Sequence, residues 1–359
     1  MSKILFLVPR MNIGGAETYV YTLAMELHKR GEEVFIASAG GKLADKLAQL
    51  GIKTFFLPVR FSKMLSGYLL LRILKKYKID ILHANSGAAG EVAAWIKSKL
   101  NIKVVYTAHG VFGNFEREYI IDRCDKIICV SNYVKQHALE LGFTKDKLVT
   151  LYTGIDSKKF TPNPEVRKLL RQQYGIDDDT LVLGIVSRIK NFKQKGHGDL
   201  LDLFSSFPEA KSWKLIVVGK GNGLIPFKLK AKKLGLENNI ICLGHRTDVE
   251  YVCNAIDILV LPTMMETFGL VIAEAMALGK PAVVYSVGGT PEVVVDGKTG
   301  YLIEHKNITA MYKAIKKLAD NKKLLEAMGQ NASQWVRSSL ELEKFIDNIE
   351  TVYKELLVK

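Results

Sequence analysis

The apolar residues of this chain follow two alternating patterns. Short runs rich in β-branched and aromatic residues predict buried strands, and longer segments with apolar residues every three or four positions predict helices. The first series of predicted strands covers residues 4–8, 33–37, 54–57, 81–83, 104–107 and 126–130. Helical patterns occupy residues 16–30, 43–50, 69–77, 91–100, 116–123 and 133–141. Alternation of this kind predicts a parallel sheet with helices on both faces.

The same alternation restarts after Pro162 and Pro164. Its predicted strands cover residues 181–187, 214–218, 240–243, 258–262 and 281–285. We therefore expect an α/β protein with two doubly wound, Rossmann-like domains, residues 1–162 and 163–339, that face each other across a cleft. The amphipathic segment 340–359 is expected to pack back on the first domain. In such sheets ligands bind beyond the carboxyl ends of the strands.

Composition is typical of a soluble globular protein. The chain has 359 residues, of which 48% are hydrophobic and 25% are charged. No apolar run approaches the roughly 20 residues of a membrane-spanning helix, and the apolar start is too short for a signal peptide. We therefore expect a cytoplasmic protein. The four cysteines show neither disulfide nor metal-ligand spacing.

Positive charge is concentrated in the first half. The net charge is +14, and residues 1–160 carry ten of these charges. An acidic partner is therefore expected for this half, although no nucleic-acid-binding module is present. Residues 61–78 combine an apolar face with clustered lysines, which suits peripheral contact with an anionic membrane. A half-buried helix with a solvated basic end is the alternative interpretation.

One predicted helix contains an isolated carboxylate. Residues 270–278 are all apolar except Glu274, and Gly279 and Pro281 are suited to end the helix. A carboxylate in such surroundings is costly unless several donors satisfy it. Those donors could come from a distant arginine or from the hydroxyl groups of a bound sugar. The sequence leaves both possibilities open.

Other candidate groups follow predicted strands. A basic loop after residue 187 contains Arg188, Lys193 and Lys195, a combination that suits a diphosphate, although a solvated loop would have the same composition. Gly15 opens the first helix, where amides favour an anion. His109 ends a strand of the first domain. The run Gly-Lys-Gly-Asn-Gly at 219–223 lacks the last glycine of a dinucleotide fingerprint and predicts only a turn.

Together these residues resemble the retaining family-4 glycosyltransferases of the GT-B fold, also described as group 1 glycosyl transferases. Glu266 and Glu274, with Thr-Phe-Gly-Leu between them, resemble the EX7E motif of that family. Further segments that resemble the family lie in the expected order at residues 14–17, 129–131, 154–160 and 288–292.

The resemblance implies an enzyme, a retaining hexosyltransferase that uses a nucleotide sugar, with a UDP-sugar as the expected donor. The positive charge of the first half suggests an anionic or membrane-held acceptor, such as a lipid-linked saccharide or a cell-envelope glycan. Neither a cofactor nor a metal ion is expected. A non-catalytic sugar-nucleotide-binding protein on the same fold is the alternative.

The resemblance also assigns roles to residues. Glu274 would accept hydrogen bonds from the donor ribose, and Glu266 would contact the transferred sugar. Arg188 would neutralise the diphosphate with either Lys195 or Lys193, since each lysine keeps a different part of the family pattern. The other assigned positions are His109 beside the sugar, Gly15 at the diphosphate, Arg246 near the base, and the amides of Phe268, Gly269 and Leu270.

Overall fold

The protein consists of two compact units in the computed structural model, which describes residues 1–12, 14–113 and 119–358. Unit 1 contains residues 1–154 and the C-terminal segment from Glu343 onward, and unit 2 contains Ile155–Leu342. This division falls before the boundary expected at residue 162. The reason is local bonding, because Ile155 N donates to Leu340 O at 2.7 Å and Asn163 N donates to Asn254 Oδ1 at 2.7 Å, both within unit 2.

Unit 1 is built on a seven-stranded sheet in which all paired strands are parallel. The strand order is β3-β2-β1-β4-β5-β6-β7. The strands are β1 (Lys3–Leu7), β2 (Glu33–Ser38), β3 (Lys53–Phe56), β4 (Ile81–Asn85), β5 (Lys103–Ala108), β6 (Lys126–Cys129) and β7 (Leu148–Thr150). The helices are α1 (Gly15–Lys29), α2 (Lys42–Gln49), α3 (Lys63–Tyr77), α4 (Gly87–Lys97), α6 (Asn132–Glu140) and α15 (Leu342–Val358), with 3-10 turns η1 (Tyr119–Arg123) and η2 (Lys145–Lys147).

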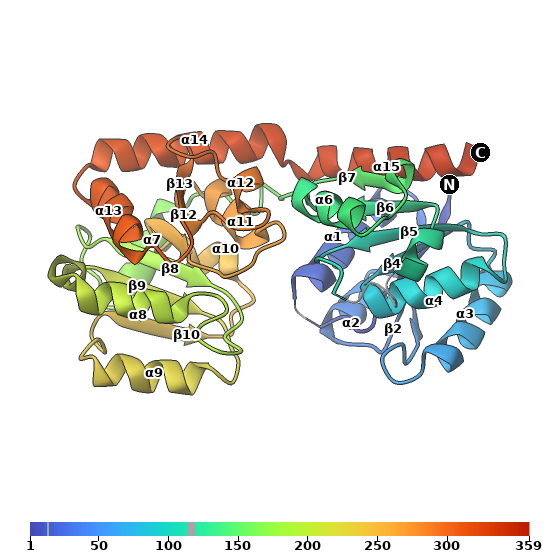
Figure 1. Cartoon of the computed structure of the whole chain (residues 1–359), viewed down its shortest axis with the longest axis horizontal. Coiled ribbons are helices and arrows are strands. Elements are labelled where there is room, and N and C mark those ends of the chain that lie inside the picture. Colours follow the sequence, from blue (N-terminus) through green and yellow to red (C-terminus); the bar gives the residue numbers. More distant parts are fainter. Residues whose placement is uncertain (13, 114–118, 359) are drawn as a thin grey trace. The chain divides into compact units, whose positions relative to one another are not determined.

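The C-terminal helix α15 is part of unit 1 (Figure 1). Its charged side is held by Arg30, which forms ion pairs with Glu343, Asp347 and Glu350. Its apolar side is buried along its length. Helix α15 therefore contributes to the core of the same unit as β1.

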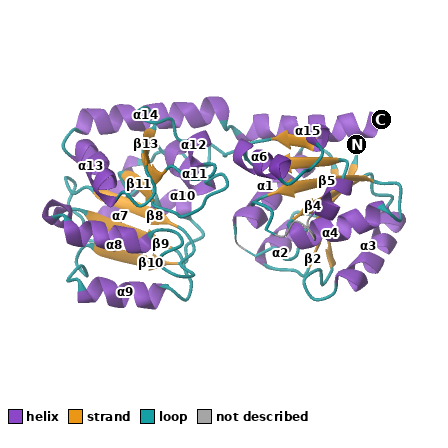
Figure 2. Cartoon of the chain, in the orientation of Figure 1, coloured by secondary structure: helices purple, strands orange, loops and turns teal. Residues whose placement is uncertain are grey.

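Unit 2 is built on a six-stranded parallel sheet with the order β10-β9-β8-β11-β12-β13. The strands are β8 (Val182–Val186), β9 (Lys214–Val218), β10 (Ile240–Gly244), β11 (Ile258–Leu261), β12 (Ala282–Tyr285) and β13 (Gly300–Ile303). The helices are α7 (Pro164–Gln173), α8 (His197–Ser206), α9 (Leu224–Lys233), α10 (Val249–Val252), α11 (Leu270–Ala277), α12 (Thr290–Val293), α13 (Ile308–Ala319) and α14 (Lys322–Ser339), with η3 at Pro208–Ser212. Figure 2 shows the strands of each unit lying between its helices.

The predicted α/β class with two doubly wound sheets is confirmed. Two helices begin earlier than the apolar pattern suggested, because Ser62 caps Leu65 N at the start of α3 and Ser86 caps Ala89 N at the start of α4. The helix predicted at 116–123 is wrong for residues 119–123, which form the 3-10 turn η1, and residues 116–118 lie outside the described part of the chain. Strands β7 and β13 were not predicted, since runs of three and four residues carry little pattern.

The order of strands decides which loops are neighbours. In unit 1 the direction of winding reverses between β1 and β4, and in unit 2 it reverses between β8 and β11. The carboxyl ends of strands at such a switch point are where doubly wound sheets bind ligands. In unit 2 these ends lead directly into the Arg188 loop and the Glu266 loop. Within the described ranges no helix has the length and apolar content that crossing a bilayer requires.

Candidate active site

The basic loop between β8 and α8 has a backbone fixed by hydrogen bonds to the segment 220–223, and it exposes Arg188. Ile189 N donates to Lys220 O at 3.0 Å, and Gly223 N donates to Ile189 O at 2.9 Å. A Cβ atom on Gly221 would lie 2.2 Å from Ile189 O, so only a glycine allows this approach. The run 219–223, predicted only as a turn, thus supports the loop that carries Arg188. The guanidinium of Arg188 is exposed and has no ion pair among the residues that the structure describes.

The structure separates the two candidate lysines. Lys195 Nζ lies 2.7 Å from Glu266 Oε2, and both side chains are largely buried, with 26% and 17% exposed. Lys193 is exposed instead. Gly196 makes the approach possible, because its φ is +75° and a Cβ there would lie 1.9 Å from Pro262 O. Lys195 is therefore the lysine that the fold brings to the EX7E segment.

The segment from Glu266 to α11 is held by backbone contacts with the next loop. Gly289 N donates to Glu266 O at 2.8 Å. Phe268 is buried, and Gly269 adopts a left-handed conformation, with φ +95°, immediately before α11 begins at Leu270. Among the described residues no side chain caps this helix, so the amides of its first turn are directed toward the space before Leu270. Glu266, Phe268, Gly269 and Leu270 thus form one rigid corner at the carboxyl end of β11.

Glu274 lies one turn into α11 and is half-buried. Its carboxylate accepts no hydrogen bond and forms no ion pair anywhere in the described ranges, so the distant arginine considered from the sequence is not found there. Burial raises the pKa of Glu274 to about 7, and Lys159 opposes this rise while Glu250 adds to it. A half-buried carboxylate without donors is an acceptor that a ligand can satisfy.

Arg246, after β10, already has a carboxylate partner. Its Nε and Nη2 atoms donate to the two carboxylate oxygens of Asp248 at 2.9 and 2.6 Å. This bidentate pair raises the pKa of Arg246 and lowers the pKa of Asp248. The structure thus places Arg246 at the carboxyl edge of the sheet but commits its guanidinium to a neighbour.

In unit 1, His109 is held by neighbours at the carboxyl edge. Its Nε2 lies 2.9 Å from Asn85 Oδ1, and its ring packs edge-on against Tyr19 at 4.6 Å between centroids. Because the amide oxygen only accepts, His109 Nε2 carries the proton in this contact. Burial lowers the pKa of His109 to about 4. The imidazole is therefore neutral at pH 7.

A second histidine lies behind His109 in a buried polar network. His83 Nδ1 lies 2.6 Å from Tyr353 Oη on α15, and His83 Nε2 lies 2.7 Å from Thr107 Oγ1. Tyr19 Oη is 3.3 Å from the same threonine oxygen. Burial and the nearby His109 lower the pKa of His83 to about 3. Sequence reasoning missed this network, although two polar residues at the end of an apolar strand, His83 and Asn85, were a visible signal.

Gly15, the first residue of α1, is exposed. A Cβ atom there would meet nothing within 4 Å, and its φ is not positive. The fold of unit 1 therefore does not itself require a glycine at this position. Its predicted role toward a diphosphate stays a prediction.

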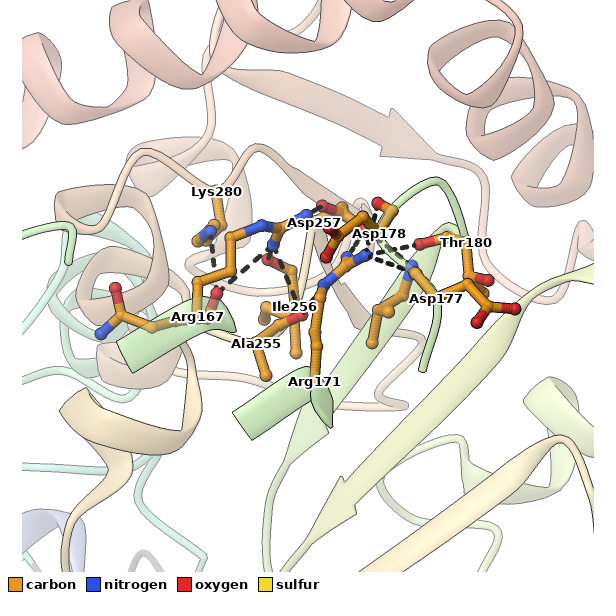
Figure 3. A network of polar contacts seen from close by, with 11 residues as sticks. Arg167, Arg171, Asp177, Asp178, Thr180, Ala255, Ile256, Asp257 and Lys280 are labelled. Carbon is orange, nitrogen blue, oxygen red and sulfur yellow. Dashed lines mark hydrogen bonds and ion pairs between the residues drawn. The ribbon is translucent and has the colours of Figure 1, made fainter. Parts of the chain in front are cut away.

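The opposite, amino edge of the unit 2 sheet contains a closed ion network (Figure 3). Arg171, only 1% exposed, donates to Asp257 Oδ2 at 2.6 Å, and Arg167 donates to Asp257 Oδ1 at 2.6 Å. Further donors and acceptors are backbone groups, including the carbonyls of Asp177, Asp178 and Thr180. These groups precede β8 and β11, so the network joins helix α7 to the sheet on the side away from the candidate site.

Comparison with known proteins agrees with this geometry. Residues 13–159 match the family model described as Glycosyltransferase Family 4, and residues 166–335 match Glycosyl transferases group 1. The chain belongs to the family-4 glycosyltransferases of the GT-B fold. Glycosyl transfer is accordingly its activity.

Relatives of this glycosyltransferase span nearly the whole chain. The N-acetyl-alpha-D-glucosaminyl L-malate synthase of Bacillus anthracis is 26% identical over 96% of this chain and 95% of the relative. The UDP-Gal:alpha-D-GlcNAc-diphosphoundecaprenol alpha-1,3-galactosyltransferase of Escherichia coli is 27% identical over 90% of this chain and 89% of the relative.

Solved structures share the fold. A glycosyltransferase from Rickettsia africae superposes with a TM-score of 0.89 at 25% identity, covering 99% of this chain and 98% of that chain. Anabaena Alr3699/HepE in complex with UDP and glucose superposes with a TM-score of 0.89 at 24% identity, covering 99% of this chain and all of the other.

Proposed function

We propose that this glycosyltransferase transfers a hexose from a UDP-sugar, with retention of anomeric configuration and without a metal ion. The acceptor in this proposal is a saccharide that is lipid-linked or belongs to the cell envelope. The reaction takes place in the cytoplasm, at the inner face of the membrane.

The observation that carries the donor half is the unsatisfied carboxylate of Glu274. Glu274 lies in α11, the helix that follows Glu266 in the chain. The amides of Leu270 and its neighbours form the start of this helix. Two vicinal hydroxyl groups of a ribose would supply the donors that this carboxylate lacks. The resemblance to the EX7E motif assigns Glu274 the same contact, so the physical argument and the family pattern support one role.

The charge of the leaving group gives Arg188 and Lys195 their proposed role. Departure of a nucleoside diphosphate builds negative charge, which preorganised donors stabilise. Arg188 has no carboxylate partner in the described part of the chain, and Lys195 is already held beside Glu266. These two cations and the first-turn amides of α11 would supply charge stabilisation that a metal would otherwise provide.

Retention follows in this proposal from where the departing phosphate lies. Positive charge developing at the anomeric carbon is stabilised by the phosphate on the face it is leaving. The acceptor hydroxyl attacks the same face and passes its proton to that phosphate, so no protein nucleophile is required. Glu266 would then orient the transferred sugar, and His109, neutral because of its burial, would accept or donate a hydrogen bond beside it.

The names of relatives support the choice of substrates. The Escherichia coli enzyme uses UDP-Gal and a diphosphoundecaprenol-linked sugar, and several Corynebacterium relatives act on D-inositol 3-phosphate. The Anabaena structure contains UDP and glucose. A uridine nucleotide sugar and an anionic acceptor are therefore the substrates to test first.

A thermal-shift panel of nucleotide sugars tests the donor. A ligand present at ~100 times its Kd stabilises a protein by about 2.7 kcal/mol, so the true donor should raise Tm clearly. Glu274→Ala should abolish that shift, while Asp320→Ala, on the exposed end of α13, should keep it. If the Glu274 variant retains the full shift, the assigned ribose contact is wrong.

A second measurement separates transfer from binding alone. Release of UDP, with or without an added acceptor, should accompany donor binding in a catalyst. Tight donor binding with neither transfer nor slow hydrolysis would favour the non-catalytic alternative. Analysis of the anomeric configuration of the product by NMR decides whether it is retained.

A further inference from the structure

Two loops of unit 2 bring Lys195 and Glu266 together. One loop lies between β8 and α8 and carries the lysine, and the other lies between β11 and α11 and carries the glutamate. Lys195 Nζ lies 2.7 Å from Glu266 Oε2 and 3.5 Å from the carbonyl oxygen of Met265. Both side chains of this ion pair are long and partly exposed, so the pair alone does not fix the distance between the two backbones. A contact closer to the backbone would hold the loops more precisely.

Thr263 makes such a contact. It is the second residue after β11, and its side chain is 0% exposed. Its Oγ1 atom lies 2.8 Å from Met265 O and 3.3 Å from Gln194 O. The hydroxyl group has one proton and two lone pairs, so it donates mainly to the nearer carbonyl and also accepts from Met265 N, at 3.4 Å. Gln194 directly precedes Lys195 and Met265 directly precedes Glu266, so Thr263 contacts each loop one residue before its charged group.

Backbone contacts surround this hydroxyl group. Met264 N donates to Gln194 O at 3.1 Å. Gly196 packs so closely on Pro262 that a Cβ atom there would lie 1.9 Å from Pro262 O. The threonine hydroxyl therefore belongs to a junction made of backbone groups, whose geometry is more precise than that of two flexible side chains.

The Glu266 loop has little other packing of its own. Among residues 263–267 only the side chain of Thr263 is buried, and those of Met264 and Met265 are 48% and 52% exposed. A valine in place of Thr263 would remove the 2.8 Å hydrogen bond and place a methyl group against the Met265 carbonyl, which favours separation of the two loops. A displacement of about 1 Å between reacting groups can lower a rate by about 10²-fold.

We propose that Thr263 is a positioning residue of this glycosyltransferase, whose hydroxyl group holds the Lys195 loop against the Glu266 loop. Thr263 acts through Lys195 and not by contact with a substrate. Its effect on catalysis rests on the proposed function, in which Lys195 stabilises the leaving diphosphate and Glu266 orients the transferred sugar. Its effect on the arrangement of the two loops does not depend on any substrate.

Chemical labelling of lysines tests the positioning without a donor. The full chain is briefly acetylated with acetic anhydride, and fragmentation of its peptides in a mass spectrometer compares Lys195 with the exposed Lys193 as internal standard. An amine in an ion pair keeps its proton and reacts slowly, so Thr263→Val should raise the ratio of Lys195 to Lys193 labelling at least about threefold. Thr263→Ser keeps the hydroxyl group and should leave this ratio unchanged.

Thr299 provides a matched control in the same unit. It is 3% exposed, and its Oγ1 accepts from Val295 N at 2.9 Å in the turn before β13, at the amino edge of the sheet. Thr299→Val thus removes a buried hydroxyl group of the same kind without altering either loop. Its labelling ratio and its kcat should stay within about twofold of those of the unaltered chain. Circular dichroism verifies that each variant is folded.

Steady-state kinetics connects the positioning to transfer. With the donor that the thermal-shift panel identifies, Thr263→Val should lower kcat about 10–100-fold, and Thr263→Ser should retain at least about a third of it. The KM for the donor should change by less than about threefold, because the ribose contact assigned to Glu274 is not altered. In a chain that already carries Lys195→Met, adding Thr263→Val should lower kcat by less than about threefold further, since its effect passes through Lys195.

The proposal is overturned if Thr263→Val leaves the labelling ratio unchanged, or if it lowers kcat by the same factor with and without the amine of Lys195. An unchanged ratio cannot be attributed to a wrong donor, because the labelling uses no substrate. A raised ratio in a chain that transfers sugar from no UDP-sugar supports the positioning and contradicts the proposed function instead.

Discussion

The two edges of the unit 2 sheet use the same kinds of side chain in opposite ways. At the amino edge, the guanidinium of Arg171 is surrounded by Asp257 and backbone carbonyls, and every partner is in place (Figure 3). At the carboxyl edge, the guanidinium of Arg188 and the carboxylate of Glu274 have no such partners among the described residues. Charged groups whose partners are all in place stabilise the fold, whereas charged groups without such partners are candidates for binding a ligand.

The difference between the edges shows that burial of charge does not by itself mark a binding site. Arg171 is more deeply buried than Arg188 or Glu274, yet its network is structural. The useful signal is a group that is buried or fixed but unsatisfied. This contrast can be tested by altering one group at a time on each edge.

The largest effect is expected at the closed edge. Asp257→Ala leaves Arg171 buried without its carboxylate, and breaking a buried ion pair in this way costs about 3–5 kcal/mol. Chemical denaturation monitored by circular dichroism should show this loss. The exposed pair Lys316–Asp320 is the control, and Asp320→Ala should cost less than about 0.5 kcal/mol. Equal losses at the two sites would contradict the structural role assigned to the network.

Lys195 is expected to give the next largest effect, on catalysis rather than stability. Lys195→Met removes a cation that the proposal places on the leaving diphosphate, and loss of one such group lowers kcat by about 10²–10³-fold. Lys193→Met should change kcat by less than about threefold, because the exposed lysine contacts neither glutamate. Steady-state kinetics with the identified donor measures both. A larger loss in the Lys193 variant would reverse the assignment.

The raised pKa of Glu274 predicts that the stability of the fold depends on pH. Burial raises its pKa in the folded state to about 7, above the value of 4.5 for an unperturbed carboxyl. The folded state therefore binds the proton more tightly, so its stability falls as the pH rises through the window from about 4.5 to about 7. Glu274→Gln should remove this loss and raise the free energy of unfolding at pH 8 by on the order of 2 kcal/mol. Identical pH profiles for the two proteins would show that the carboxylate is satisfied in the fold.

The smallest effect is expected from the closed network of unit 1. Tyr353→Phe removes the hydroxyl beside His83 Nδ1 and leaves a buried ring nitrogen without its partner, at a cost of about 1 kcal/mol. The variant should unfold at a lower denaturant concentration. Tyr301→Phe, in unit 2, should not change the midpoint and serves as a control, because the hydroxyl of Tyr301 lies outside this network.

Much of the donor side could be read from residues close together in the sequence. The spacing of Glu266 and Glu274, the glycine after Lys195 and the cations after residue 187 are all local patterns, and they were sufficient to suggest the family and the residues to examine. They could not choose between Lys193 and Lys195. That choice depended on Gly196, whose positive φ lets the loop approach Pro262 and sets Lys195 beside Glu266.

The sequence by itself determined the α/β class, the existence of two sheets and the placing of candidate groups at strand ends, because these follow from short-range periodicity and from the rule that parallel strands bind ligands at their carboxyl edge. Only the tertiary structure decided that Glu274 lacks a donor in the described part of the chain, that the glycine run at 219–223 supports the Arg188 loop, and that Tyr353 reaches His83 across 270 residues of sequence. Whether a polar group finds a hydrogen-bond partner depends on which strand ends are neighbours in the fold. A local sequence pattern contains no information about the distances between those strand ends.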